Sequence, residues 1–221
     1  MAAGKIVDLR KLLAERFPQE PFPTASRLET GLPVFDQALA GGLPKGAITE
    51  LSGTRPQAGS ATLFAALLER ARRERYFIAL IDGRDSFDPA AVSDTALRHL
   101  LWVRCHQATE ALQAADLLLR DGNFPLIVLD LVLNPALELR RIPQNNWYRL
   151  QRLVEPAPTA FLVFTAQPMI SSAQGKLALE NRWTLPQLEE PTAELAGALR
   201  FCARRLQPNE WRNGSALSRV G

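Results

Sequence analysis

Long apolar runs alternate with helical patterns through the middle of this chain, and this alternation limits its fold more than any other feature. The runs lack the every-second-residue polarity of a strand with one wet face, which indicates strands buried on both faces. Such strands, separated by helices, form a mostly parallel sheet between two helical layers. The sequence therefore predicts a three-layer α/β domain. The expected strands are 47–51, 77–81, 100–103, 126–131 and 161–164, and the expected helices are 60–74, 109–120 and 145–154.

At 221 residues and 47% hydrophobic, the chain is long enough to bury one such core. We expect the core domain to span residues 28–190. The segment 191–221 is expected to hold a helix over 193–206 and then a loose tail, because Pro, Asn, Gly and Ser replace apolar residues there.

The first 27 residues are expected to form a short helix and a proline-rich linker. Apolar residues recur at steps of three and four over 5–17, and Pro18, Pro21 and Pro23 follow. A helix this short has little stability alone, so it should dock on another surface. That surface is either its own domain or another protein. The residues expected to bind a partner are Leu9, Leu12 and Leu13.

Cysteine spacing and hydropathy exclude several other classes of protein. Cys105 and Cys202 lie far apart with no CxxC spacing, so we expect two ordinary buried thiols and neither a disulfide nor a metal site. No apolar run approaches the roughly 20 residues of a membrane helix, and no signal-peptide core opens the chain. We therefore expect a cytoplasmic protein without a membrane span.

A glycine-bounded loop from Gly53 to Gly59 joins the first expected strand to the first expected helix. This is the setting of a P-loop, in which Gly, four residues, Gly, Lys and Ser or Thr surround the phosphates of a nucleotide. Here five residues separate the glycines, and Ser60 stands where the Lys belongs. Loss of that Lys removes a charge-assisted hydrogen bond of roughly 1.5–3 kcal/mol. The sequence thus predicts a degenerate nucleotide site.

Substitutes for the lost groups exist near this loop. Thr62 offers a hydroxyl one position late, and Arg55 or Arg84 could supply the missing positive charge. The alternative is a relic turn that only packs the strand against its helix. We favour the relic turn, because the geometry of a phosphate cradle depends on loop length as much as on charge.

Three segments in order resemble the core of RecA recombinases. Residues 30–53 are similar to the segment that leads into the P-loop, 81–89 to the strand and turn that carry the catalytic carboxylate, and 126–130 to the Walker B strand. The order and spacing match over about 28–185. The resemblance implies a RecA-like fold with a mostly parallel central sheet.

Within that superfamily the chain looks most like the ImuA group of RecA-like accessory proteins of translesion synthesis. It is similar to that group in its small size, its eroded P-loop and its strand and turn at 81–89. The resemblance implies a role in SOS-induced mutagenesis beside a polymerase-like ImuB-type protein and an error-prone replicative polymerase. We expect the ImuB-type protein, RecA, or both as partners.

Departures from the recombinase pattern affect the chemistry. Asp82 is retained, but two positions later, where the pattern has the Glu that activates water, stands Arg84. An Arg stays protonated and cannot act as a general base. Asp130 keeps the Mg²⁺-linked position but has no P-loop Lys to act with. We therefore expect a protein that is not an enzyme and takes no cofactor. The alternative, which Asp82 and Asp130 motivate, is a DNA-dependent ATPase or recombinase with an unorthodox P-loop.

Two segments correspond to the loops with which recombinases bind single-stranded DNA. Residues 134–146 contain Arg140 and Arg141, and 168–182 contain Lys176 and Arg182. Basic residues beside aromatic ones suit backbone neutralisation and base stacking. The alternative is that these residues belong to solvated helical faces, with Trp147 in the core. We expect protein contacts to come first and DNA contact to be secondary.

Overall fold

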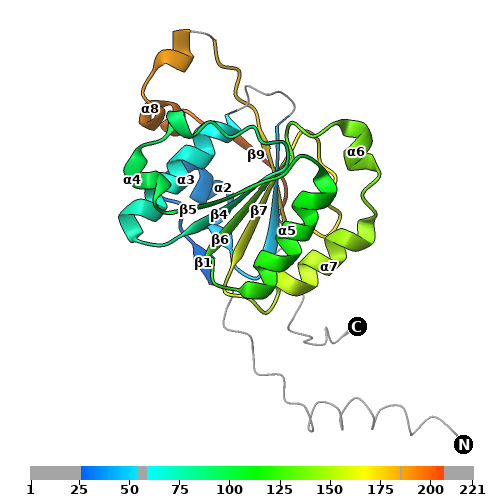
Figure 1. Ribbon diagram of the computed structural model, residues 1–221. Helices are drawn as coiled ribbons and strands as arrows, with labels where there is room; N and C mark the ends of the chain where they lie inside the picture. Colours follow the sequence, from blue (N-terminus) through cyan, green and yellow to red (C-terminus); the bar gives the residue numbers. More distant parts are fainter. Residues whose placement is uncertain (1–25, 54–58, 185, 207–221) are drawn as a thin grey trace, which may run out of the picture.

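Seven strands form one central sheet in the part of the chain that the computed structural model describes, residues 26–53, 59–184 and 186–206 (Figure 1). Their order is β5-β4-β6-β7-β3-β8-β9, and all neighbours are parallel except β8 and β9. The strands are β3 (Ala47–Gly53), β4 (Ile78–Asp82), β5 (Leu100–Arg104), β6 (Leu126–Asp130), β7 (Ala160–Thr165), β8 (Gly175–Leu179) and β9 (Phe201–Leu206). A separate antiparallel pair joins β1 (Arg27–Leu28) to β2 (Leu43–Pro44).

Helices cover both faces of this sheet (Figure 1). On one face α5 contacts β4 and β6, and α7 contacts β3. On the other face α3 is the longest helix and contacts α4 and α8. The helices are α2 (Pro33–Ala38), α3 (Ser60–Glu74), α4 (Asp94–Leu97), α5 (Ala108–Asp121), α6 (Ala136–Arg140), α7 (Gln144–Val154) and α8 (Thr192–Gly197), with 3-10 turns η2 (Pro89–Ala91) and η3 (Pro186–Glu189). The expected three-layer α/β domain with a mostly parallel sheet is confirmed.

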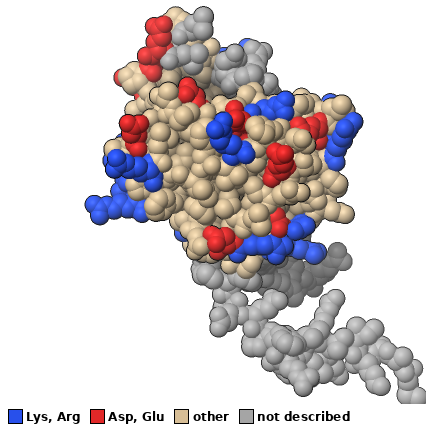
Figure 2. Space-filling view, viewed as in Figure 1, with Lys and Arg blue, Asp and Glu red and all other residues tan. Residues whose placement is uncertain are grey.

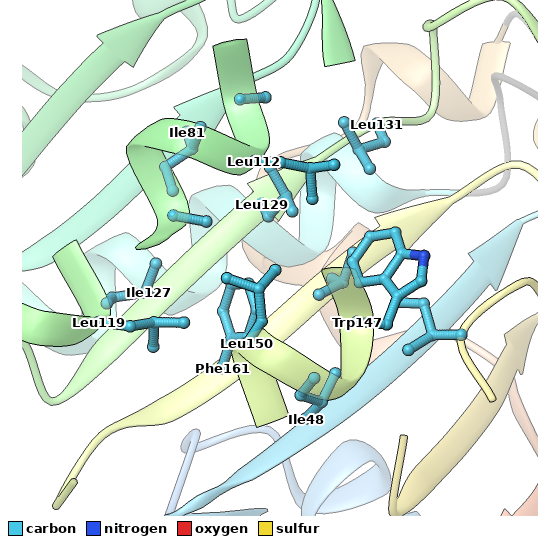
Figure 3. Packing of buried hydrophobic residues seen from close by; sticks show 14 of the residues in the cluster. Ile48, Ile81, Leu112, Leu119, Ile127, Leu129, Leu131, Trp147, Leu150 and Phe161 are labelled. Carbon is cyan, nitrogen blue, oxygen red and sulfur yellow. The ribbon is translucent and has the colours of Figure 1, made fainter. Parts of the chain in front are cut away.

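Each face of the sheet has its own hydrophobic core, because successive side chains of a buried strand point to opposite sides. In β7, Phe161 and Val163 pack in the core under α5 and α7, whereas Leu162 and Phe164 pack in the core under α3. Figure 3 shows the first of these cores, in which Trp147 of α7 is fully buried. Burial on both faces explains why the strands read as continuous apolar runs.

The carboxyl-terminal part of the fold corrects one expectation. The helix expected over 193–206 is instead α8 followed by β9, which pairs antiparallel with β8. Phe201 of β9 packs on Phe35 with ring centroids 4.7 Å apart, and this contact draws the segment onto the sheet. Residues 192–206 therefore belong to the core fold. The expected tail beyond 206 lies outside the described residues.

The expectations on the cysteines, the membrane span and the amino-terminal helix have different outcomes. Cys105 is buried, and its burial raises the pKa of the thiol, whereas Cys202 on β9 is exposed, which corrects the expectation that both thiols are buried. The two cysteines form no disulfide. No helix within the described residues has the length and apolar character needed to cross a membrane. The expected helix at 5–17, with Leu9, Leu12 and Leu13, lies outside the described residues.

Candidate functional site: a degenerate nucleotide cavity

The degenerate loop joins the end of β3 to the start of α3, as expected. Gly53 is the last residue of β3 and is buried, and Ser60 is the first residue of α3. Residues 54–58, and with them Arg55, lie outside the described residues. Gly59 caps α3 in the left-handed conformation, with φ of 103°, which only glycine adopts without strain. No side chain within the described residues caps this helix end.

The amino end of α3 is packed against residues from the carboxyl-terminal part of the fold. A Cβ placed on Gly59 would lie 2.7 Å from Leu199 Cδ2 and 3.2 Å from Trp183 Nε1. Both side chains therefore pack closely against the Gly59 backbone, at the point where a P-loop approaches phosphate, and leave no room for a side chain there. Sequence reasoning missed Trp183 and Leu199, because nothing in the local pattern predicts that they reach α3.

Asp82, at the end of β4, is buried and organises the turn that follows it. Its Oδ2 accepts hydrogen bonds from the backbone N–H groups of Ser86 and Phe87, each at 2.8 Å, and from the Trp102 indole N–H at 3.3 Å. Its Oδ1 accepts from Ser86 Oγ at 3.2 Å and from the Arg84 backbone N–H at 3.3 Å. Both carboxylate oxygens are thus committed within the fold.

Aromatic side chains continue from this turn to the edge of the sheet. Phe87 meets Phe64 of α3 edge-on at 5.4 Å and Trp102 of β5 edge-on at 5.3 Å. The Arg104 guanidinium lies 4.9 Å from the Trp102 ring and binds both carboxylate oxygens of Asp85, at 2.6 and 2.7 Å. Hydrogen bonding from Arg104 lowers the pKa of Asp85. Hydrophobic packing therefore occupies one side of the turn that follows β4.

Asp130, at the end of β6, lies directly across from Asp82 in the strand register. Its Oδ1 accepts one hydrogen bond, from the Val132 backbone N–H at 2.9 Å. Burial of the carboxyl group raises the pKa of Asp130 to about 6, against the lowering effect of the Val132 N–H, and the negative charge of Asp82 raises it further. Asp130 is therefore a weakly supported carboxylate in a site that favours its neutral form.

A cavity of about 210 Å³ lies between the amino end of α3 and the ends of β4 and β6. Ser60 and Asp130 both line it, so the fold brings these two predicted site residues together, while Thr62 is not among the described residues that line it. Most of the lining is apolar and includes Phe64, Phe87 and Leu133. Its charged members are Asp88 and Asp130, and no Lys or Arg is found among its described lining residues.

Arg84 does not face this cavity. Its guanidinium Nη1 donates to the His106 backbone carbonyl at 2.7 Å, in the loop that follows β5. The side chain is exposed and does not line the cavity. Arg84 therefore supplies no positive charge there, and Arg55 cannot be placed.

The four residues predicted to contact DNA lie on several different elements. Arg140 and Arg141 are exposed on α6 and at its end, and Arg182 is exposed after β8. Lys176 corrects the expectation of a loop, because it lies within β8 with its Nζ 3.4 Å from Glu50 Oε2. Figure 2 shows basic and acidic side chains interspersed on the viewed face, without a field of one sign. Direct DNA contact stays a prediction.

Glu50 of β3, a residue that sequence reasoning did not place in a site, fixes the loop after β7. It is 1% exposed, and its Oε1 accepts hydrogen bonds from the backbone N–H groups of Met169 at 2.6 Å and Ile170 at 3.1 Å. This loop is therefore held in place from inside the sheet. The only sequence signal was a lone acidic residue within an apolar strand.

Comparisons with known proteins place this site in a family context. The family model described as the RecA N-terminal domain matches residues 18–146. The chain is 32% identical over 122 residues to Protein RecA of Bifidobacterium breve, covering 54% of this chain and 31% of the relative. For Protein RecA of Leifsonia xyli the identity is 36% over 121 residues, covering 53% and 32%. For that of Teredinibacter turnerae it is 34% over 125 residues, covering 54% and 35%. The chain thus matches about a third of the length of these relatives.

Proposed function

The chain belongs to the RecA N-terminal domain family, and from that premise we propose that it is a non-catalytic RecA-like accessory protein in translesion DNA synthesis after DNA damage. The observation that carries the proposal is the chemistry of the cavity at the degenerate loop. Its lining has two carboxylates, many apolar groups and, among the described residues, no cation. Because such a cavity lacks a cation for phosphate, we infer that the domain acts through contacts with other macromolecules.

Electrostatics support the absence of nucleotide turnover. A phosphate oxygen about 4 Å from a carboxylate is repelled by roughly 4 kcal/mol at an effective dielectric constant of about 20. In a working site the P-loop Lys and Mg²⁺ overcome that repulsion. Here Ser60 stands in place of the Lys, Arg84 is bound to the His106 carbonyl, and Asp82 has both oxygens occupied. Neither the phosphate anchor nor the activating base is in place among these residues.

The partners follow from the resemblance to the ImuA group. We propose a polymerase-like ImuB-type protein, RecA, or both, reached through the amino-terminal apolar residues Leu9, Leu12 and Leu13. The RecA relatives support the general link to DNA repair and recombination. The translesion role is the finer part of the proposal.

A binding assay tests the proposed partners. Purified chain carrying Leu9→Ala, Leu12→Ala and Leu13→Ala is compared with the wild type for co-purification with RecA filaments and with the ImuB-type protein. We expect the triple variant to lose at least tenfold in affinity, because three apolar anchors are removed. Lys11→Ala with Glu15→Ala, two polar residues that helical spacing puts opposite these leucines, is the control. Unchanged binding of the triple variant would reject this mode of contact.

The second candidate is an ATPase or recombinase, which the RecA relatives and the retained Asp130 favour. Steady-state ATP hydrolysis with and without single-stranded DNA separates the two candidates. Our proposal predicts no hydrolysis above the buffer background. Hydrolysis that disappears in Asp130→Ala, but persists in the exposed control Asp94→Ala, would establish the enzyme instead.

A further inference from the structure

An exposed apolar corner stands beside the degenerate cavity. Leu133 is 50% exposed and Leu137 is 64% exposed, although both lie within a well-packed part of the fold. Leu133 also lines the cavity, so the apolar lining continues outward onto the surface. Large apolar side chains that stay exposed together mark interaction sites more often than isolated ones do. We name Leu133, Leu137, Arg140 and Arg141 the α6 corner.

The two arginines of the α6 corner are free to meet an external partner. They follow Leu137 by three and four residues, which places them on the same side of the helix. No ion pair to either one is found among the described residues, in contrast to Arg104, Arg120 and Arg149. Their nearest acidic neighbour along the chain, Glu138, is engaged elsewhere, because its Oε1 accepts a hydrogen bond from the Ala108 backbone N–H at the start of α5.

The backbone beneath the α6 corner is held rigidly. Asn134 is 5% exposed, and its Nδ2 donates to the Gly83 carbonyl at 2.9 Å, which ties the corner to the turn after β4. Leu139 and Ile142 are each 7% exposed and anchor the other side of α6 in the core under α5 and α7. A surface fixed in this way loses little conformational entropy when a partner binds.

Charge changes sign along this surface. At the cavity end, Asp88 and Asp130 line the cavity together with Leu133, whereas Arg140 and Arg141 lie outside this lining, on α6 and at its end. A nucleic-acid backbone, which is negative throughout, would be repelled at the acidic end. Leu133 and Leu137 are aliphatic and Trp147 is fully buried, so the α6 corner itself has no aromatic ring for base stacking; the exposed aromatic Tyr148, 51% exposed, lies on α7. These observations favour a protein partner.

We propose that the α6 corner is the docking site for a partner segment that carries apolar anchor residues with Asp or Glu beside them. The anchors cover Leu133 and Leu137, and the acidic side chains meet Arg140 and Arg141. The inference rests on the proposed function only in that a scaffold must bind another protein. It adds a second contact surface, made of residues other than Leu9, Leu12 and Leu13.

A random dodecapeptide library displayed on phage tests the proposal with the full chain as bait. Selection against the wild type is followed by depletion on Leu133→Ser with Leu137→Ser. We expect the surviving peptides to pair apolar residues with Asp or Glu. The winning peptide, made synthetically and labelled, should bind the Arg140→Glu, Arg141→Glu variant at least tenfold more weakly than the wild type. A peptide with Lys replacing its acidic residues should regain binding to that variant.

Matched controls and a second probe keep the outcomes distinct. Leu117→Ser removes a leucine that is 68% exposed on α5, and Arg152→Glu reverses an exposed arginine on α7, so neither should change binding of the peptide. Thermal melting confirms that each variant is folded. The proposal is overturned if no peptide family survives depletion, or if the Arg variants bind the peptide normally. It is also overturned if labelled oligo(dT) binds through Arg140 and Arg141 while no peptide does.

This experiment and the co-purification assay fail independently. Loss of partner binding in the Leu9, Leu12 and Leu13 variant, together with no peptide selected by the α6 corner, would leave the proposed function standing and reject only this surface. Selection of such a peptide, together with ATP hydrolysis that depends on Asp130, would support the α6 corner as a docking site and reject the proposed function.

Discussion

Two neighbouring strands of the sheet, β4 and β6, end in aspartate, and the two carboxylates differ in the number of hydrogen-bond donors around them. Asp82 and Asp130 lie across from each other in the register of β4 and β6. Asp82 accepts hydrogen bonds from five donor groups, whereas Asp130 accepts one and borders an apolar cavity. Burial lifts the pKa of Asp130 to about 6. The Asp82 carboxylate supports the fold through these hydrogen bonds, whereas the Asp130 carboxylate has a single donor and a raised pKa.

The contrast shows why a retained acidic residue is weak evidence for retained chemistry. Asp82 needs no nucleotide to explain it, because the turn 83–87 and the Trp102 indole depend on its oxygens. Asp130 has no such structural reason, and its surroundings penalise its charge. Substitutions at Asp82, Asp130, Gly59 and Arg84 test this difference.

Replacing Asp82 should damage the fold most. Asp82→Ala leaves the N–H groups of Ser86 and Phe87 and the Trp102 indole N–H without their acceptor. Because each buried unpaired donor costs about 1–3 kcal/mol, we expect the free energy of unfolding to fall by about 3–5 kcal/mol. Urea denaturation measures the loss. Asp88→Ala, which removes only an exposed cap of the Ala90 N–H, should cost less than about 1 kcal/mol. Equal losses in Asp82→Ala and Asp88→Ala would contradict the structural role of Asp82.

Replacing Asp130 should stabilise the fold, whereas replacing Asp82 should destabilise it. Its pKa in the folded state, about 6, lies above its ordinary value of 3.8, so the folded state holds the proton more tightly than the unfolded state. The free energy of unfolding should therefore fall as pH rises from about 4 to about 6, and the penalty should be complete above pH 6. Asp130→Asn removes the titration and keeps an oxygen for the Val132 N–H.

We expect Asp130→Asn to stabilise the chain by about 1–3 kcal/mol at pH 7.5 and by almost nothing at pH 4. Urea denaturation at the two pH values, with the wild type alongside, gives the difference. Destabilisation at pH 7.5 would mean that the Asp130 carboxylate has a stabilising partner after all.

A substitution at Gly59 tests how tightly Leu199 packs against the amino end of α3. Gly59→Ala places a methyl group 2.7 Å from Leu199 Cδ2 on a backbone with φ of 103°, so we expect a loss of about 1–2 kcal/mol. Gly122→Ala is the matched control, because it also has positive φ, 69°, but meets nothing within 4 Å. Its loss should be smaller, about 1 kcal/mol. A tolerated Gly59→Ala would mean that Leu199 does not press on this end of the helix.

Replacing Arg84 should change almost nothing. Arg84→Ala removes an exposed guanidinium that contacts the His106 carbonyl, and exposed substitutions of this kind stay within about 0.5 kcal/mol. Urea denaturation and nucleotide binding are measured on the same preparation. A change in nucleotide binding would show that Arg84 had moved into the cavity and taken over the role of the lost Lys.

Much of the fold could be predicted from the sequence, because strands buried on both faces leave an unmistakable apolar run. The five expected strands match β3 to β7 within two residues at each end, and the expected helix 60–74 coincides with α3. The P-loop pattern and the RecA resemblance also assigned Ser60 and Asp130 to one site, and both line the same cavity. These features depend on local pattern and on motifs that can be read in the sequence.

The rest depended on contacts between distant segments. The sequence predicts a helix over 193–206, whereas its second half forms β9, because these residues pair antiparallel with β8. Nothing local indicates that Leu199 presses on Gly59, or that Glu50 lies opposite Lys176. The role of Asp82 was hidden because its donors are mostly backbone N–H groups, which every sequence contains.

The melting temperature with added nucleotide shows whether the cavity beside Ser60 and Asp130 still binds a triphosphate. The full chain is melted with increasing ATP and Mg²⁺, beside Asp130→Ala. A ligand at about 100 times its dissociation constant stabilises a folded protein by roughly 2.7 kcal/mol. We expect no saturable rise in melting temperature for either protein. A saturable rise for the wild type that is absent from Asp130→Ala would contradict it, because the cavity would then still hold a triphosphate.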